Sequence, residues 1–159
     1  MTGFKTINKK VTKALRKLRK KDSSLLEIDV NERTISHKLA EYLQEEFPKL
    51  HVDCEYNRHG GLTKLLDLPK DQINWDDIES KTVFPDIVIH KRKIDSRNLL
   101  VIEIKKSSNK VKREFDINKI IGLTINTYNY KFGLFVEFNV DDCGHSLKWY
   151  KKGKLFHEM

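Results

Sequence analysis

Two apolar stretches of the chain each contain an acidic residue, and in one of them a lysine follows two positions later. The stretches are VFPDIVIH (83–90), with Asp86, and LLVIEIKK (99–106), with Glu103 and Lys105. Such runs are typical of central strands, where an unpaired carboxylate costs several kcal/mol. Because alternate residues of a strand share a face, Glu103 and Lys105 are neighbours near one strand end. Two buried carboxylates require a cation.

The segment KRKIDSRN between these runs is a basic turn of hairpin type. If the runs pair, Asp86 comes within metal-bridging reach of Glu103, and such hard oxygen ligands suit Mg²⁺ or Mn²⁺. Pro85 is typical of a strand edge, a first residue or a bulge, so we expect a local bend at Asp86. The competing interpretation is a structural Asp–Lys or Glu–Lys pair. The Pro-Asp step, the spacing between the two acids and the apolar surroundings together favour a metal site over such a pair.

An upstream helix supplies a further acidic residue. The pattern predicts a helix over 31–47, capped by Asp29 or Asn31 and stopped by Pro48. Its buried stripe has helical spacing and consists of Ile35, Leu39, Leu43 and Phe47. Glu32 lies three residues before the first of these, so it projects from the core-facing side. This acid strengthens the prediction of a site.

The rest of the chain predicts a mixed α/β domain with a central sheet. Residues 62–82 are predicted to form a polar connection, an excursion from the domain and not a second domain. The predicted element order is α-α-β-β-β-α-β-β. Besides the segments above, the predicted elements are a strand at 51–58, a helix at 111–127, and strands at 131–138 and 146–154, the last of which ends in a turn.

These motifs resemble the PD-(D/E)xK nuclease superfamily, which has the restriction-endonuclease-like fold. Pro85-Asp86 followed by Glu103-Ile104-Lys105 matches its signature, and Glu32 matches an extra acid that many members carry on the preceding helix. Residues 29–140 follow the family's αβββαβ core. NERTISHKLAEYL, VDCEYNR and FPDIVIH with LLVIEIKKS look like a group of small bacterial members.

The resemblance implies that Asp86 and Glu103 hold a metal ion, together with the carbonyl of Ile104. It implies that Glu32 binds the metal directly or through water, and that Lys105 orients or helps to deprotonate the attacking water. The expected activity is Mg²⁺-dependent, or Mn²⁺-dependent, hydrolysis of DNA phosphodiesters. The alternative is a non-catalytic nucleic-acid-binding or assembly module that retains the fold.

The positive charge of the chain is concentrated at its N-terminus. The net charge is +8, and nine of the 31 Lys and Arg residues lie in the first 21 positions, which contain no acid. Such asymmetry predicts an anionic partner for this segment. An apolar stripe recurs at helical spacing through the same residues: Phe4, Ile7, Val11, Ala14, Leu15 and Leu18.

We therefore expect a basic amphipathic helix over 1–22 followed by a nuclease-like domain over 23–159, as one domain overall. A helix packed on the domain with a solvated basic face explains the pattern about as well as nucleic-acid contact does. A third interpretation is docking of this helix on a partner or membrane. The candidate nucleic-acid contacts are Lys9, Lys13, Lys17, Arg58 and Lys119.

Several function classes are excluded by composition and motif. The 159 residues contain no apolar run long enough to span a membrane, no secretion signal and no phosphate loop of an ATPase. Cys54 and Cys143 lie far apart without CxxC spacing, which excludes a disulfide framework or zinc ribbon. We expect a cytoplasmic protein whose partner is nucleic acid, DNA in preference to RNA, and not a membrane. A homodimer or a targeting partner protein stays open.

Overall fold

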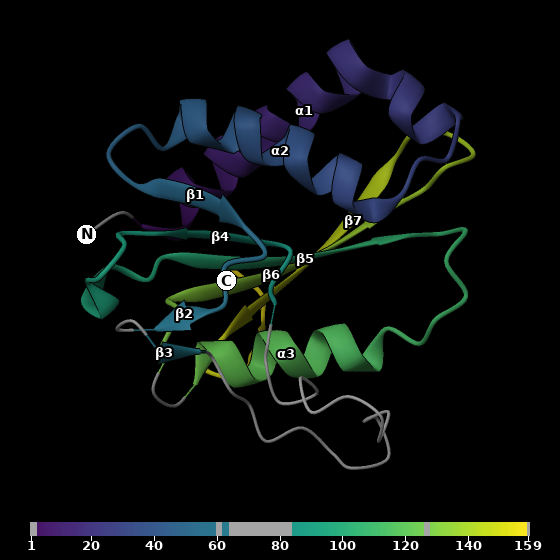
Figure 1. Ribbon diagram of the computed structural model, residues 1–159. Coiled ribbons are helices and arrows are strands. Elements are labelled where there is room, and N and C mark those ends of the chain that lie inside the picture. The colour runs from purple at the N-terminus through teal and green to yellow at the C-terminus, as the bar shows by residue number, and fades with distance from the viewer. Residues whose placement is uncertain (1–2, 60–61, 64–83, 126–127, 159) are drawn as a thin grey trace.

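The computed structural model describes residues 3–59, 62–63, 84–125 and 128–158, which form a mixed α/β structure (Figure 1). In chain order the elements are α1 (Phe4–Glu27), α2 (Glu32–Glu46), β1 (His51–Cys54), β2 (Arg58–His59), β3 (Leu62–Thr63), β4 (Ile87–His90), η3 (Asp95–Arg97), β5 (Leu100–Lys106), α3 (Glu114–Thr124), β6 (Phe132–Phe138), β7 (His145–Lys151) and β8 (Lys154–Phe156). The predicted α/β class is confirmed.

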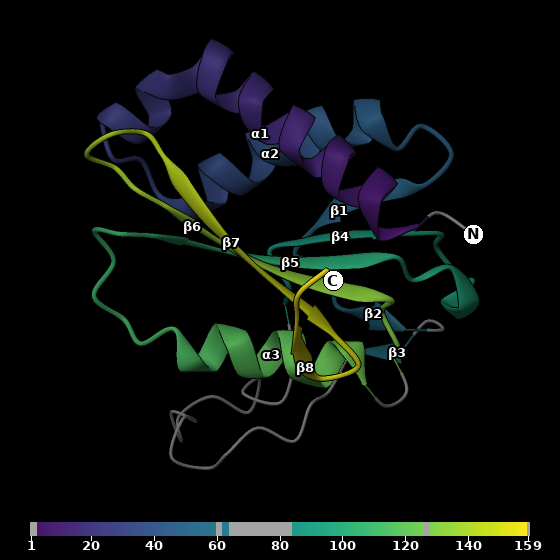
Figure 2. The ribbon, with the colours of Figure 1, turned by 180° about the vertical axis from the view of Figure 1, so that it is seen from behind.

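The main sheet has six strands in the order β1-β4-β5-β6-β7-β8, and β2 pairs separately with β3. Strands β5 and β6 are parallel and are joined through α3, while the other neighbours are antiparallel. A parallel pair needs such a crossover, because its second strand must start again at the same edge. Helix α3 covers one face of the sheet, and α1 and α2 lie together on the other (Figures 1 and 2).

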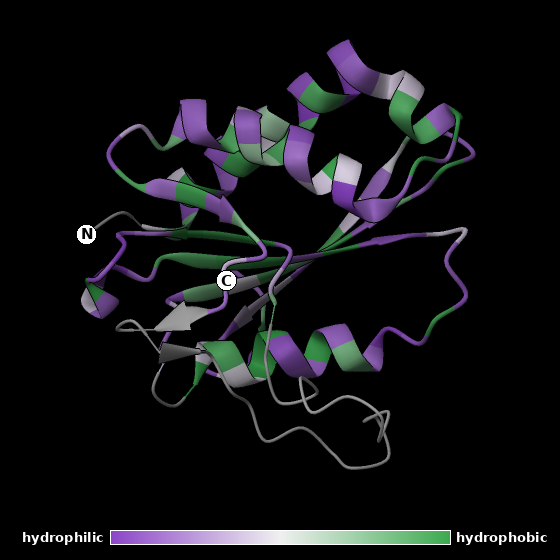
Figure 3. Cartoon of the chain, viewed as in Figure 1, coloured by the Kyte–Doolittle hydropathy of each residue, from purple (hydrophilic) through white to green (hydrophobic). Residues whose placement is uncertain are grey.

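The larger core lies between the sheet and the pair α1 and α2. The predicted stripe of α1 is almost completely buried, and it packs with the apolar side of α2 against β4, β5 and β6. Figure 3 shows β4 and β5 as mainly apolar strands below helices of mixed polarity. Because six α1 residues (Ile7, Val11, Ala14, Leu15, Leu18 and Leu26) belong to this core, the basic helix is an integral part of the fold.

The ends of several elements differ from the sequence prediction. Asp22 has non-helical dihedral angles (φ −131°, ψ 29°) at the predicted boundary after residue 22, but α1 continues to Glu27. The break at 22–24 is therefore a kink within α1 and not its end. The predicted strand 51–58 ends at Cys54, because Glu55 adopts a positive φ of 49°.

At the C-terminus, the predicted strand 146–154 ends in a turn, as expected, but a further strand, β8, follows the turn and pairs with β7. Lys152 (φ 50°) and Gly153 (φ 73°) both have left-handed backbone conformations, which suit a tight two-residue turn. Of the two candidate caps of α2, Asn31 accepts a hydrogen bond from Thr34 N at 2.9 Å. In the predicted excursion 62–82, residues 64–82 lie outside the described residues.

Gly133 on β6 allows α3 to approach the sheet closely. A Cβ atom added there would lie 2.3 Å from Ile120 Cγ2 and 3.1 Å from Thr124 Cγ2.

We expect Gly133→Ala to lower the free energy of unfolding by about 1–3 kcal/mol, because the helix must shift outward. Urea denaturation measures this change. The control is Gly3→Ala, which has no atom within 4 Å of the new Cβ and should cost less than about 1 kcal/mol. Equal stability of Gly133→Ala and wild type would contradict the close packing.

Candidate functional site

The candidate site lies on the α3 face of the sheet, at the carboxyl end of β5. The register of the antiparallel pair joins Ile87 to Ile102, so the next position places Asp86 opposite Glu103. The predicted pairing of the two apolar runs is confirmed. Asp86 directly precedes β4, so Pro85 lies outside the strand, where a residue without an N–H group is tolerated. Asp86 Oδ2 instead accepts a hydrogen bond from Ile104 N at 2.7 Å, which ties the carboxylate to β5.

Glu103 is the most deeply buried acid of the site, with 0% exposure. Its Oε2 lies 2.6 Å from Lys119 Nζ on α3. Neither carboxylate oxygen has a hydrogen-bond partner of good geometry among the described residues. Burial raises the pKa of Glu103 well above its ordinary value; Lys119 opposes this shift, while Asp86 and Asp116 reinforce it. Strand β5 therefore contains a buried carboxylate that can still accept hydrogen bonds or bind a cation.

Further ion pairs extend from Lys119 to the N-terminus of α2. Lys119 Nζ lies 3.4 Å from Asp116 Oδ1, and Asp116 Oδ2 lies 2.7 Å from Lys105 Nζ. Lys105 Nζ is in turn 3.9 Å from Glu32 Oε2. We call the whole set the acidic cluster: Glu32, Asp86, Glu103, Lys105, Asp116 and Lys119. Its four carboxyl groups outnumber its two ammonium groups.

Glu32 holds the start of α2 against the end of β5. Its Oε1 accepts hydrogen bonds from Lys106 N and Asn109 Nδ2, both at 2.9 Å. Lys106 itself points to the opposite face of the sheet, where its Nζ donates to Asp29 Oδ1 at 2.6 Å and to the Val30 carbonyl at 2.7 Å. Lys106 is therefore outside the site, as its position in the strand predicts.

The acidic environment affects the protonation of Asp86 and Lys119 in opposite ways. Burial raises the pKa of Asp86 to about 6, against the lowering effects of Lys119 and the Ile104 N–H; Asp116 and Glu32 raise it further. Burial alone would lower the pKa of Lys119, but the carboxylates of Glu103 and Asp86 outweigh it and hold that pKa above its ordinary value. Lys119 therefore stays charged, while Asp86 exchanges its proton near neutral pH.

The donor atoms of the cluster fit a hard divalent cation. No three His, Cys, Asp or Glu side chains of the described residues converge as a complete metal cage. Mg²⁺, however, is usually held by only one or two carboxylates and keeps several waters. Asp86 and Glu103 are opposed across two strands, and Glu103 Oε1 has no partner in the described part of the chain. The excess of carboxylates also favours a bound cation.

Two residues of the acidic cluster were not predicted as site residues from the sequence. Asp116 was not identified as functional, and Lys119 was expected to contact nucleic acid. Both are buried and both belong to the acidic cluster. A signal existed, because Asp116 and Lys119 share the helical side of Ile120 and Leu123, which face the sheet. A charged pair on the apolar side of a helix is as informative as a charged residue inside an apolar strand.

The other predicted nucleic-acid contacts are not brought to this site. Lys13 pairs with Glu46 at 2.6 Å, and Lys17 pairs with Glu45 and lies 4.9 Å from the centre of the Tyr42 ring. Lys9 is exposed and has no ion pair among the described residues. All three are on α1, which covers the face opposite to α3 (Figure 2). Arg58 begins β2, and its side chain lies outside the described residues.

No protein-family model matches this chain, and no curated protein matches it significantly. The chemistry of the acidic cluster is therefore interpreted from its own geometry. Among the helices of the described ranges, none is long and apolar enough to cross a membrane.

The raised pKa of Asp86 predicts a pH-dependent effect of Asp86→Asn on stability. The contribution of Asp86 to wild-type stability should fall as pH rises from about 4 to 6, because its carboxyl keeps a proton in the folded state that the unfolded state releases. In metal-free buffer, Asp86→Asn should match wild type near pH 4 and exceed it by about 2–3 kcal/mol at pH 8. Urea denaturation with a chelator across this range measures the difference.

The exposed Asp141 provides the matched control. Asp141→Asn should change stability by less than about 0.5 kcal/mol at either pH. A lower stability of Asp86→Asn at pH 8 would show instead that the Asp86 carboxylate is part of a stabilising ion pair.

Proposed function

We propose that the protein is a Mg²⁺-dependent or Mn²⁺-dependent nuclease of the PD-(D/E)xK type that hydrolyses phosphodiester bonds of DNA. The observation that carries the proposal is the fully buried Glu103 beside Asp86, with an unpartnered oxygen in the described part of the structure. A fold that needed only stability would gain nothing from an apolar strand with such a carboxylate. Binding of a cation that in turn binds phosphate would account for the carboxylate at this position.

The arrangement of the elements supports the same proposal. The order α2, β1, β4, β5, α3, β6 is the one expected for the αβββαβ core of the restriction-endonuclease-like fold. Asp86 directly precedes β4, and the Glu103-Ile104-Lys105 segment lies on the adjacent antiparallel strand β5, which is the placement expected from the signature of that superfamily. Glu32 starts the helix before them and lies 3.9 Å from Lys105.

In this proposal Asp86 and Glu103 would hold the metal, together with the carbonyl of Ile104, and Glu32 would bind it directly or through water. The bound ion would lower the pKa of water and stabilise the phosphate charge. Lys105 orients the attacking water and places a fixed positive charge beside the phosphate. Asp116 positions Lys105 at 2.7 Å. Lys119, 2.6 Å from Glu103, favours the ionised form of that carboxylate, which is the form that ligates.

The second candidate is a non-catalytic nucleic-acid-binding or assembly module with the same fold. The observation that favours it is that Lys105 and Lys119 already pair with carboxylates of the protein itself, Asp116 and Glu103. Ion pairs of this kind also join α3 to β5. The two candidates differ in one result: only the nuclease cleaves DNA in a metal-dependent way.

The role of Lys105 is tested by removing its charge without leaving Asp116 unpaired. We expect the double variant Lys105→Met, Asp116→Asn to lose metal-dependent cleavage by at least about 100-fold. Nicking of duplex, single-stranded and branched DNA, with RNA as a further substrate, measures the loss. The melting temperature reports whether the fold is kept.

Asp116→Asn alone is the control, because it retains the lysine. It should cut less than about tenfold more slowly than wild type, since Asp116 only positions Lys105. Wild-type cleavage by the double variant would refute the role of Lys105. Absence of metal-dependent cleavage of every substrate by the wild-type protein would favour the non-catalytic module.

Nucleic-acid affinity is expected to come largely from the exposed cations of α1. Lys9 and Lys20 are exposed and have no ion pair among the described residues, whereas Lys13 and Lys17 are engaged by Glu46 and Glu45. The double variant Lys9→Gln, Lys20→Gln should flatten the slope of log K against log salt by about 0.9 per lost phosphate contact on duplex DNA. Binding titrations at several salt concentrations measure the slope.

The matched control is Lys148→Gln, Lys154→Gln, which removes the same charge from exposed positions on β7 and β8. It should leave the slope nearly unchanged. Equal slopes for wild type and the α1 variant would remove α1 from the binding surface. Deletion of residues 1–21 is unsuitable, because it also removes the buried stripe of α1.

A further inference from the structure

A cavity lies at the other end of the sheet from the acidic cluster. This cavity has a volume of about 530 Å³, within the range of about 300–1,000 Å³ that is usual for small-ligand sites. We call it the basic pocket; its lining is Leu50, Asp95, Ser96, Arg97, Asn98, Leu99, Asn129, Tyr130, Lys131, Lys151 and Lys152. Strands rise about 3.3 Å per residue, so the six steps from Leu99 to Lys105 separate the two sites by about 20 Å.

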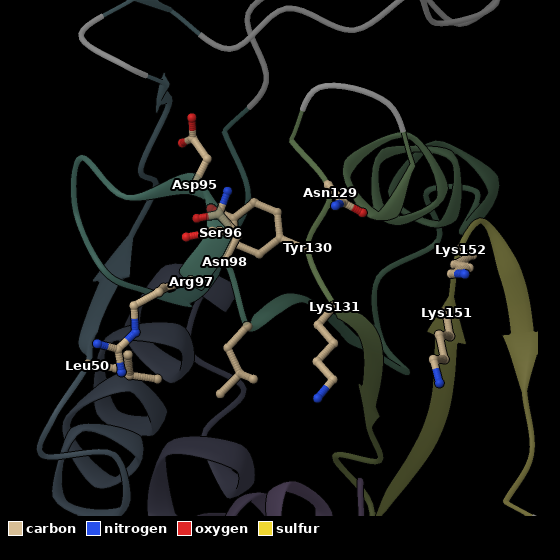
Figure 4. A pocket seen from close by; sticks show the side chains of 11 residues that line it. Leu50, Asp95, Ser96, Arg97, Asn98, Asn129, Tyr130, Lys131, Lys151 and Lys152 are labelled. Carbon is tan, nitrogen blue, oxygen red and sulfur yellow. The ribbon is translucent and has the colours of Figure 1, made fainter. Parts of the chain in front are cut away.

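The charge of the basic pocket is strongly one-sided. Arg97, Lys131, Lys151 and Lys152 line it, against the single carboxylate of Asp95. Figure 4 shows Arg97 and Leu50 on one side and Lys151 and Lys152 on the other, with Tyr130 and Lys131 between them. Arg97, Lys151 and Lys152 form no ion pair with any carboxylate of the described residues. The pocket therefore favours an anion.

Two of these cations are held close to the same aromatic ring. Lys131 Nζ lies 5.7 Å from the centre of the Phe132 ring, and Lys151 Nζ lies 5.5 Å from it. Lys151 also lies 5.3 Å from the Phe156 ring centre. Cation–π contacts orient these side chains.

The walls of the pocket are joined by hydrogen bonds, so the cavity exists before any ligand binds. Asn98 Nδ2 donates to the Tyr128 carbonyl at 2.9 Å, and Lys131 N donates to the Asn98 carbonyl at 3.0 Å. Phe132 N donates to the Leu99 carbonyl at 3.1 Å. These bonds connect the segment before β5 to the segment before β6. A preformed site loses less entropy on binding than a flexible one.

The pocket also has an apolar part. Leu50 and Leu99 contribute carbon surface to the lining. Inorganic phosphate alone would leave this surface and much of the volume unused. A ligand with a phosphate group and a flat organic part uses both, since aromatic and apolar side chains bind the face of a nucleobase.

We propose that the basic pocket binds a nucleoside monophosphate group, with the phosphate at the cations that line the pocket and the base against Leu50 and Leu99. Arg97 supplies the planar donor pair that phosphate oxygens accept in bidentate fashion. The group belongs either to a free mononucleotide or to the 5′-phosphorylated end of an oligonucleotide. The proposal is independent of the nuclease activity, because its residues lie apart from the acidic cluster.

Isothermal titration calorimetry tests the proposal on the full chain, in a chelating buffer at about 0.15 M salt, where weak surface attraction is screened. The probes are adenosine 5′-monophosphate, adenosine, inorganic phosphate, and a tetranucleotide with or without a 5′-phosphate. Adenosine monophosphate should bind with one-to-one stoichiometry, at least about tenfold more tightly than adenosine or inorganic phosphate. A further gain with the 5′-phosphorylated tetranucleotide would identify an oligonucleotide end as the source, and no gain a free nucleotide.

Two variants assign the binding to this pocket. Arg97→Gln and Lys151→Gln should each weaken binding of adenosine monophosphate by about tenfold, the usual effect of losing one charge-assisted hydrogen bond. The control Lys148→Gln, Lys154→Gln should change it less than twofold. Arg97 is exposed on η3, so its variant remains decisive even if Lys151→Gln unfolds. Absence of binding to wild type, wild-type affinity of Arg97→Gln, or equal loss in the control would overturn the proposal.

Discussion

The ion pair between Glu103 and Lys119 joins the central strand β5 to helix α3 inside the core, and the surrounding structure must accommodate its charge. A fully buried carboxylate is costly unless a cation stays beside it, so α3 has to place Lys119 within 2.6 Å of Glu103. The close approach of α3 at Gly133 makes this position accessible to the helix. Asp116 then lies one turn before Lys119, and its carboxylate is in turn balanced by Lys105 at 2.7 Å.

The two faces of the sheet differ in role: one contributes mainly to stability, and the other contains the candidate site. The face under α1 and α2 is the larger apolar core. The α3 face contains smaller apolar clusters, which leave room for buried charges between them. Glu32 connects the two, because it starts α2 yet accepts a hydrogen bond from the backbone of Lys106 at the end of β5. The acidic cluster is therefore positioned by elements on both sides of the sheet.

The two ends of the sheet also differ in charge. Carboxylates outnumber ammonium groups at the carboxyl end of β5, whereas the basic pocket near its amino end is lined by four cations and one acid. The exposed basic side of α1 forms a third charged region, on the face opposite to α3. Because these regions lie on separate elements, a substitution in one leaves the local electrostatics of the others nearly unchanged beyond a Debye length of about 10 Å.

The sequence alone determined most of the local structure and four of the six residues of the acidic cluster, Glu32 among them. Alternation and helical spacing identified α1, α2, β4, β5, α3 and β6, and the PD step with ExK selected Asp86, Glu103 and Lys105, because these patterns depend on neighbours along the chain. Local signals also gave Asn31 as one of two candidate caps and predicted a turn at the end of the 146–154 strand, but they did not predict β8. Only the tertiary structure decided the partners. Lys119 neutralises Glu103, Asp116 holds Lys105, Lys13 and Lys17 are engaged by α2, and the basic pocket gathers cations from three distant segments. Such pairings depend on how α3, α1 and the hairpin dock on the sheet, and docking is a property of three-dimensional packing that no local pattern encodes.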